Sequence, residues 1–276
     1  MKYGISNQNV QVQGDEIVAI LNLAWDNGIN TIDTAKAYGN SEKIIGNYLR
    51  QHLENSWNII AKLSDREINI TEQFQDSAEK LNVNPTVVLA HSAKLFLNEK
   101  FQSELQKIRD KYSISKIGVS LYNENEINQV MESTIKPDVI QLPLNILDTR
   151  LYRREVISRL FDKDIEIYVR SVFLQGLFYL PEVELESRFS DAAPHLTKLK
   201  SVAASGGLTL AELSLLWLVS LKEVCKVIIG VDNAAQLKAH LETLKKKVDP
   251  AVFEEAMSIH YENENILNPS LWPSKS

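Results

Sequence analysis

The sequence predicts an α/β fold, a (β/α)8 TIM barrel whose first strand is missing or truncated. From Gly14 onward, segments with the period of a helix alternate with short apolar runs, and such alternation is typical of a parallel sheet covered by helices. The chain has 276 residues, of which 44% are hydrophobic, and this suits a single barrel of about 250 residues. No proline-rich or glycine-rich linker interrupts it, so we expect one domain over residues 1–276.

The first half of the chain supplies four of the expected helices and four of the expected strands. Asp15 has the position of a helix cap, Ile17 and Leu21 share one face of that helix, and Gly28 ends it. Ser41 begins the second helix. The expected strands are residues 29–32, 57–61, 86–90 and 114–119, and the next two helices are residues 70–82 and about 98–112.

The second half continues the same alternation. Asn123 and Glu126 have the spacing of a capping box, as have Thr209 and Glu212 before the apolar run 213–219. Strands are expected over residues 139–142, 165–169 and 227–229, and a last helix over about 233–244. This gives seven strands, fewer than the eight that close a barrel, and the missing strand would come first.

The composition excludes several kinds of partner. A net charge of -6 and a pI near 5.5 give no basic surface for nucleic acid or an anionic membrane. Cys225 is the only cysteine, so we expect no intrachain disulfide and no cysteine-rich metal site. The histidines show no metal-ligand spacing, and no apolar run approaches the roughly 20 residues of a membrane span. We expect a cytoplasmic protein that acts on a small molecule without a metal; the oligomeric state is not predicted.

Four polar residues follow strands in one βαβαβ stretch: Asp33, Tyr38, Lys62 and His91. In a parallel barrel these positions meet at one mouth, where barrel enzymes carry out their chemistry. Taken singly, each has an ordinary interpretation, such as a turn residue, a surface aromatic, a solvated charge or a satisfied polar group. Together, an acid, a phenol, an ammonium and an imidazole indicate a site for proton transfer.

The segment from Gly28 to Gly39, followed by Ser41 and Glu42, is similar to the signature of the aldo-keto reductases. The resemblance continues through Lys62, His91, Gly118-Val119-Ser120, Gln141 with Asn145, Ser171 to Gly176, and Ile229-Gly230. It implies a (β/α)8 barrel that binds a nicotinamide dinucleotide without a Rossmann domain and reduces aldehydes or ketones. No G-x-G-x-x-G motif is then expected, and the sequence contains none.

The resemblance assigns Tyr38 as the general acid that protonates the carbonyl oxygen of a small-molecule substrate. A free phenol is a weak acid at neutral pH, and an ammonium about 4 Å away stabilises the phenolate by on the order of 4 kcal/mol. Lys62 would supply this charge, and Asp33 would hold Lys62 in place. His91 would orient the substrate by donating a hydrogen bond to its carbonyl oxygen.

For the cofactor, the resemblance implies that Ser120 and Gln141 bind the nicotinamide carboxamide. Arg170 stands where many relatives have an aromatic that stacks on the ring; it could equally be an ion-pair partner inside the barrel. Ser171, Leu174 and Gly176 belong to the turn that would follow the pyrophosphate. Gly230, Asn233 and Gln236, at the start of the last helix, would bind the adenosine phosphate end.

The choice between the two nicotinamide cofactors is open. Gln236 stands where NADP-preferring relatives often have an arginine, and Ala239 and His240 replace an acidic residue and an asparagine. A neutral glutamine gives no charged grip on a phosphate. We expect NADP(H) rather than NAD(H) only because the family favours it.

The N-terminus departs from the family pattern. Tyr3-Gly4-Ile5 looks like the loop that follows the first barrel strand in relatives, and the strand itself is absent from the sequence. Either the recorded start is short or the barrel is open, and we favour the short start because the other site residues are intact. Two alternatives to a reductase remain: a nicotinamide-binding sensor or partner subunit that has lost turnover, and an aldolase-like barrel with Lys62 as a Schiff-base lysine.

Overall fold

A computed structural model describes residues 14–64 and 69–272 of the chain. These residues divide into two compact units: residues 14–64, 69–142 and 162–167 form the first, and residues 143–161 and 168–272 form the second. The expectation of one domain over residues 1–276 stays a prediction. The expected loop Tyr3-Gly4-Ile5 lies outside the described residues.

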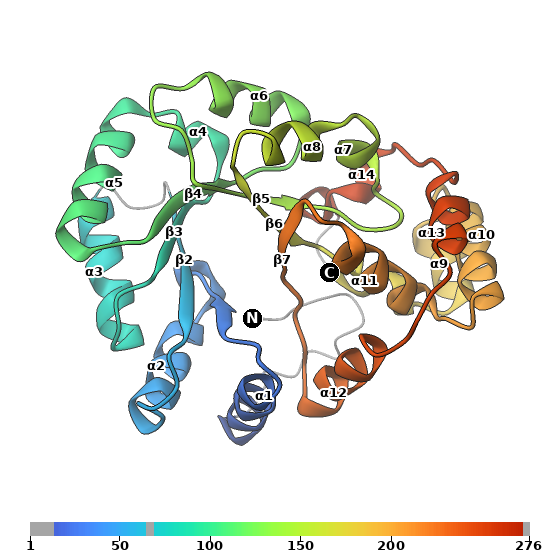
Figure 1. The fold of residues 1–276 in the computed structure, drawn as a ribbon, viewed down its shortest axis with the longest axis horizontal. Coiled ribbons are helices and arrows are strands. Elements are labelled where there is room, and N and C mark those ends of the chain that lie inside the picture. The colour runs from blue at the N-terminus through green and yellow to red at the C-terminus, as the bar shows by residue number, and fades with distance from the viewer. Residues whose placement is uncertain (1–13, 65–68, 273–276) are drawn as a thin grey trace. The chain divides into compact units, whose positions relative to one another are not determined.

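The described strands form one sheet in the order β1 to β7, which is the sequential order of a (β/α)8 barrel with one strand fewer. Their bounds are β1 Thr31–Asp33, β2 Asn58–Leu63, β3 Val87–Ala90, β4 Lys116–Ser120, β5 Val139–Pro143, β6 Glu166–Arg170 and β7 Val224–Val227. Each pair from β1 to β5 is parallel. The α/β class is therefore confirmed, and each of the first six predicted strands overlaps the strand that the structure shows (Figure 1).

The last strand is the one that the sequence misplaced. It ends at Val227, whereas the prediction was residues 227–229. Ile228 still donates its amide to Val169 O at 2.7 Å, but Ile228 and Ile229 then line a cavity and do not extend the ladder. Apolar periodicity cannot separate a strand residue from an apolar cavity wall that follows it.

The first unit contains α1 Gly14–Asp26, η1 Lys36–Tyr38, α2 Ser41–Gln51, α3 Ile70–Leu81, α4 Ala93–Phe96, α5 Glu99–Tyr112 and α6 Glu124–Glu132. The predicted helices are present, and the four-residue α4 is additional. Asp15 lies in the first turn of α1 and is not its cap; a carboxylate there still complements the helix dipole. Asn123 caps α6, but Glu126 accepts from the amide of Tyr122, so the predicted capping box is incomplete.

The core of the first unit is built on strands that are buried on both faces. Ile59, Val88 and Ile117 are fully buried, as expected for parallel strands with helices packed against them. In Figure 1, α2, α3 and α5 lie side by side outside these strands. Gly118 is required where β4 passes β5, because a Cβ at this position would lie 2.1 Å from the carbonyl oxygen of Val139.

The second unit contains α7 Arg150–Arg153, α8 Val156–Phe161, η2 Leu174–Tyr179, α9 Glu182–Arg188, α10 Ala193–Ser205, α11 Leu210–Ser220, α12 Ala234–Thr243, α13 Pro250–Met257, α14 Glu264–Leu267 and η3 Pro269–Leu271. Helix α11 is apolar almost all round, and most of its residues are buried. Thr209 and Glu212 cap α11 reciprocally, so this predicted capping box is confirmed.

No single helix in the described ranges has both the length and the apolar composition to cross a membrane. Taken together, α10 and α11 reach the length and apolar composition of a span, but the two helices are bent by 76° relative to each other.

Candidate active site

An ion pair between Lys62 and Asp33 lies at the ends of the first two strands. Asp33 pairs in register with Ile60, and Lys62 lies two residues further along β2, so its side chain projects from the same face. The Lys62 ammonium donates to Asp33 Oδ1. The two side chains are only 4% and 9% exposed, so the charges are largely removed from water and compensate each other.

Tyr38 is brought to this ion pair by a short turn. It ends the 3-10 helix η1, where its amide donates to Ala35 O at 2.9 Å. Gly39 follows with φ 65°, a conformation that glycine adopts without strain, and it turns the chain into α2. Lys62 Nζ lies 3.4 Å from Tyr38 Oη and 5.5 Å from the centre of the ring. The ammonium thus faces the phenol oxygen, which is the arrangement that the family resemblance implies.

Gln141 and Ser120 continue the cluster behind Asp33. Gln141 Nε2 donates to Asp33 Oδ2 at 2.7 Å, and Ser120 Oγ lies 3.5 Å from Gln141 Oε1. Gln141 is fully buried and Ser120 is 4% exposed. The family resemblance assigned both residues to the cofactor, and the contact of Gln141 with Asp33 was not predicted. This contact depends on the curvature of the sheet from β1 to β5.

His91 follows β3 directly, as predicted. Its amide donates to Leu63 O at 2.9 Å, which fixes the end of the strand. Its side chain is exposed and makes no hydrogen bond or ion pair with residues in the described ranges. The structure therefore joins Asp33, Tyr38 and Lys62 through side-chain contacts and leaves His91 as a neighbour along the strand ends.

In the second unit, the chain makes a sharp turn after β6. Ser171, Leu174 and Gln175 have φ values of 61°, 44° and 53°, and Gly176 has φ 91°. Positive φ in non-glycine residues costs energy unless the surroundings hold the backbone. The side chain of Arg170 is half-buried, and one of its contacts is to Ser171, with Arg170 Nη1 3.4 Å from Ser171 Oγ.

Two buried polar residues hold this turn. Asn145 Nδ2 donates to Ser171 O at 3.1 Å, and its Oδ1 accepts from the amides of residues 147 and 148. Ser214 of α11 donates to Val172 O at 2.9 Å and accepts from the amide of Ile146 at 3.3 Å. Ser214 was not predicted to have a role; the signal was a single hydroxyl within the apolar run 213–219.

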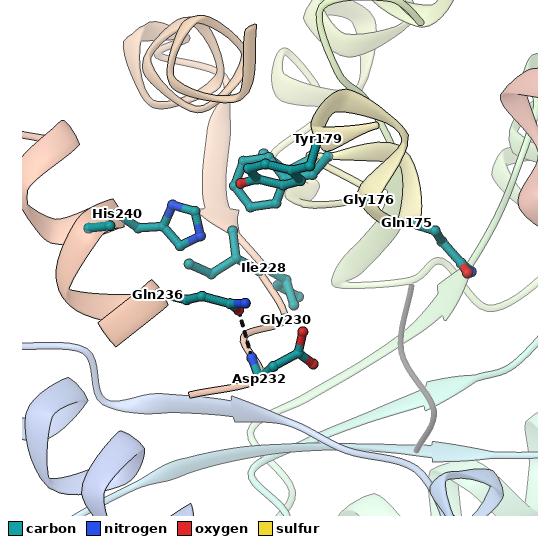
Figure 2. Close-up of a pocket in the computed structure, with 12 residues that line it drawn as sticks. Gln175, Gly176, Tyr179, Ile228, Gly230, Asp232, Gln236 and His240 are labelled. Carbon is teal, nitrogen blue, oxygen red and sulfur yellow. Dashed lines mark hydrogen bonds between the residues drawn. The ribbon is translucent and has the colours of Figure 1, made fainter. Parts of the chain in front are cut away.

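The turn forms one wall of a cavity of about 370 Å³ (Figure 2). Of the residues predicted to bind a cofactor, Gly176, Gly230 and Gln236 line this cavity. The full lining among the described residues is Val172, Phe173, Gln175, Gly176, Tyr179, Ile228, Ile229, Gly230, Asp232, Gln236, Ala239 and His240. Arg170, Ser171, Leu174 and Asn233 are not in this set. Asn233 instead caps α12 by accepting from the amide of Gln236 at 2.8 Å.

Flat rings gather on one side of the cavity. Phe173 and His240 stack with ring centroids 4.8 Å apart and planes inclined by 16°, and Tyr179 meets Phe173 edge to face at 5.6 Å. Burial lowers the pKa of His240, so its imidazole is neutral at pH 7. Tyr179 is half exposed, but partial desolvation, together with the charge of Glu212, still raises its pKa to about 12. Aromatic walls of this kind suit a planar heterocycle.

The floor of the same cavity is the start of α12. Figure 2 shows the Gln236 side chain accepting a hydrogen bond from the amide of Asp232, at 2.8 Å. A helix N-terminus carries a partial positive charge that favours phosphate groups. No group of three or more potential metal ligands occurs among the residues that the structure describes.

Comparisons with known proteins agree with this architecture. The model of the Aldo/keto reductase family matches residues 1–260. An aldo-keto reductase from Bacillus halodurans, in its holo form, matches with a TM-score of 0.76 and 19% identity, over 95% of this chain and 98% of that chain. The glycerol dehydrogenase from Gluconobacter oxydans matches with a TM-score of 0.69 and 19% identity, over 95% and 89% of the two chains. An aldo/keto reductase from Klebsiella pneumoniae, in complex with NADP and acetate, matches with a TM-score of 0.70 and 14% identity, over 97% and 89%. At these identities the structural matches show the fold.

Proposed function

The chain belongs to the aldo/keto reductase family, and from this premise we propose that it reduces an aldehyde or ketone to an alcohol, or runs the reverse reaction, with NAD(P)H as hydride donor. The substrate is a small carbonyl compound. The observation that carries the proposal is the buried Lys62–Asp33 pair with its ammonium 3.4 Å from the Tyr38 hydroxyl.

Tyr38 acts as the general acid. As the carbonyl oxygen gains negative charge, the Tyr38 hydroxyl gives it a proton, and the phenolate that remains is stabilised by the Lys62 ammonium. Asp33 keeps the ammonium charged and stationary, since a buried cation without a partner is unfavourable. His91, whose side chain is exposed at the next strand end, donates a hydrogen bond to the substrate oxygen and so sets its orientation.

The residues of the second unit fit the adenosine part of a dinucleotide. The stacked pair Phe173 and His240 offers a flat apolar wall for the base, and the N-terminus of α12 offers a site for phosphate. We assign Gly230, Asn233 and Gln236 to this end, and Arg170, Ser171, Leu174 and Gly176 to the remainder of the dinucleotide. In the first unit, Ser120 and Gln141 are the polar groups for a carboxamide. When bound, the nicotinamide supplies the hydride.

NADP(H) is the cofactor that we propose, ahead of NAD(H). The support is the family and the Klebsiella pneumoniae relative, which is described in complex with NADP. Because Gln236 is neutral, we expect only weak discrimination between the two cofactors.

Binding and turnover together test the proposal. NADPH and NADH, added separately to the purified protein, should each change in fluorescence when they bind. Members of a panel of aldehydes and ketones should then cause the protein to oxidise the reduced cofactor. Tyr38→Phe should lower turnover by at least about 100-fold and leave the cofactor dissociation constant nearly unchanged. Tyr112→Phe, which also removes a phenol hydroxyl of the first unit and its hydrogen bond from Gln75, should retain full turnover.

Each competing outcome is distinct. Full turnover in Tyr38→Phe would remove Tyr38 as the proton donor. Cofactor binding with no turnover on any carbonyl would instead indicate a nicotinamide-binding sensor or partner subunit. Borohydride trapping of a carbonyl compound on Lys62 would indicate Schiff-base chemistry.

A further inference from the structure

We propose that Gln141 is a positioning residue, which orients the Asp33 carboxylate so that the carboxylate holds the Lys62 ammonium beside the Tyr38 hydroxyl. This inference rests on the proposed function, in which Tyr38 is the proton donor. It deepens that function by naming the group that fixes the ion pair behind the donor.

Each oxygen of Asp33 has its own partner. Oδ1 accepts from the Lys62 ammonium, and Oδ2 accepts from Gln141 Nε2 at 2.7 Å. An ionised carboxylate can only accept, so the group that faces it must be the NH2 of the amide. This leaves Gln141 Oε1 directed toward Ser120 Oγ, 3.5 Å away. The amide orientation is therefore consistent with both of its neighbours.

An ammonium alone would not fix the plane of the carboxylate. Lysine presents a compact charge with rotatable donors, unlike the flat two-point grip of an arginine. With Lys62 on one oxygen only, Asp33 could turn about its Cβ–Cγ bond and carry the ammonium away from Tyr38. A second donor on the other oxygen prevents this rotation, and Gln141 is that donor.

Burial strengthens the effect. Gln141 is fully buried, and the side chains of Asp33 and Lys62 are 9% and 4% exposed. Hydrogen bonds to charged groups are roughly twice as strong as neutral ones, and little water competes for them here. Among the described residues, the titratable side chain that makes a hydrogen bond to this ion pair is Tyr38, from η1.

The same amide was assigned to the nicotinamide carboxamide, so the test must work without any nicotinamide. The readout is the carbon-13 chemical shift of the Tyr38 ring Cζ at a single neutral pH, measured in protein labelled at the tyrosine ring Cζ. The Tyr38 resonance is identified by its loss in Tyr38→Phe. Gln141→Met keeps the length and burial of the side chain and removes the donor. The Tyr38 Cζ resonance should then move toward that of a tyrosine in an unfolded peptide, because the ammonium is held less firmly against the phenol oxygen.

Gln73→Met is the matched control. Gln73 is also a buried glutamine of the first unit, 1% exposed, and its side chain makes two hydrogen bonds with the backbone of Ser64, at 2.9 and 3.0 Å. Both of these hydrogen bonds lie away from Asp33, Lys62 and Tyr38. Their loss should destabilise the fold to a similar degree and leave the Tyr38 Cζ shift where it is in the unsubstituted protein.

An unchanged Tyr38 Cζ shift in folded Gln141→Met overturns the inference. If that variant does not fold, Gln141→Asn keeps the amide but withdraws it by one methylene, and the same change in the Tyr38 Cζ shift is expected. A further measurement needs no variant: in the unsubstituted protein, one side-chain N–H of Gln141 should exchange slowly with solvent, and rapid exchange of both would also overturn the inference. These readouts require neither cofactor nor turnover, so they can fail or succeed independently of the proposed reaction.

Discussion

Removing the Asp33 carboxylate should lower the free energy of unfolding of the first unit far more than the loss of so small a side chain suggests. Asp33→Ala leaves the Lys62 ammonium, whose side chain is 4% exposed, without its charge partner. It also leaves Gln141 Nε2 without the acceptor 2.7 Å away. Breaking a buried ion pair from one side costs about 3–5 kcal/mol, and the orphaned amide places this variant toward the upper end.

The opposite substitution should cost less. Lys62→Met removes the ammonium, but Asp33 keeps the hydrogen bond from Gln141, so we expect a loss of about 3 kcal/mol. The double variant, Asp33→Ala with Lys62→Met, contains no buried charge at this place. Its loss should therefore be smaller than the sum of the single losses by at least about 2 kcal/mol.

Urea unfolding followed by tryptophan fluorescence measures these differences. Trp25 and Trp57 lie in the first unit with their ring centroids 5.2 Å apart. Replacing Trp217 and Trp272 by phenylalanine makes the signal report on that unit. Additive losses in the double variant would refute the reasoning, because they would mean that the two charges do not interact in the folded protein.

Two further predictions concern buried polar groups away from the ion pair. Ser214→Ala removes the hydrogen bonds of Ser214 to the carbonyl of Val172 and the amide of Ile146. It should lower the free energy of unfolding, measured in urea, by about 1–3 kcal/mol, and it should weaken NADPH binding. The control is Ser205→Ala at an exposed position, which should change neither quantity; equal effects of the two substitutions would contradict the role of Ser214. Burial raises the pKa of Glu42 in the folded protein above its ordinary value of 4.5, so the folded state binds this proton more tightly than the unfolded chain does. The contribution of Glu42 to stability is therefore full below pH 4.5 and falls as the pH rises from 4.5 through the folded pKa. Glu42→Gln should be more stable than the unsubstituted protein above the folded pKa and equally stable below pH 4.5. A stability difference in urea unfolding that does not vary with pH would contradict the raised pKa.

The strand ends were predictable because their physics is local. Parallel strands that are buried on both faces appear as short apolar runs, and the runs before Lys62 and His91 are almost completely buried. Since the carboxyl ends of such strands lie together, polar residues directly after them could be grouped from the sequence alone. The contact of Lys62 with Asp33 follows from two neighbouring strands in register.

What the sequence did not reveal depends on curvature and on distant partners. Gln141 and Asp33 are 108 positions apart, and their contact requires the sheet of the first unit to curl. No periodicity encodes that curl. In the second unit, Phe173 and His240 come from the turn after β6 and from α12, and their stacking depends on how each element packs. Residue type and spacing support an expectation of what these segments bind, which stays a prediction, but they do not indicate which side chains meet.

The buried polar side chains of both units obey one rule. Lys62 is held by Asp33, Asp33 by Gln141, and the strained turn after β6 by Asn145 and Ser214. A buried polar group is unfavourable unless it is satisfied, so each buried polar residue of the proposed site requires a second polar residue behind it. In the proposed function these supporting residues act through the groups that they hold, and their loss should be measurable in those groups. His91 is the exception, because its side chain is exposed and finds no such partner in the described ranges. Its backbone is fixed at the end of β3 by the hydrogen bond to Leu63 O, and in the proposed function the partner of its side chain is the substrate oxygen.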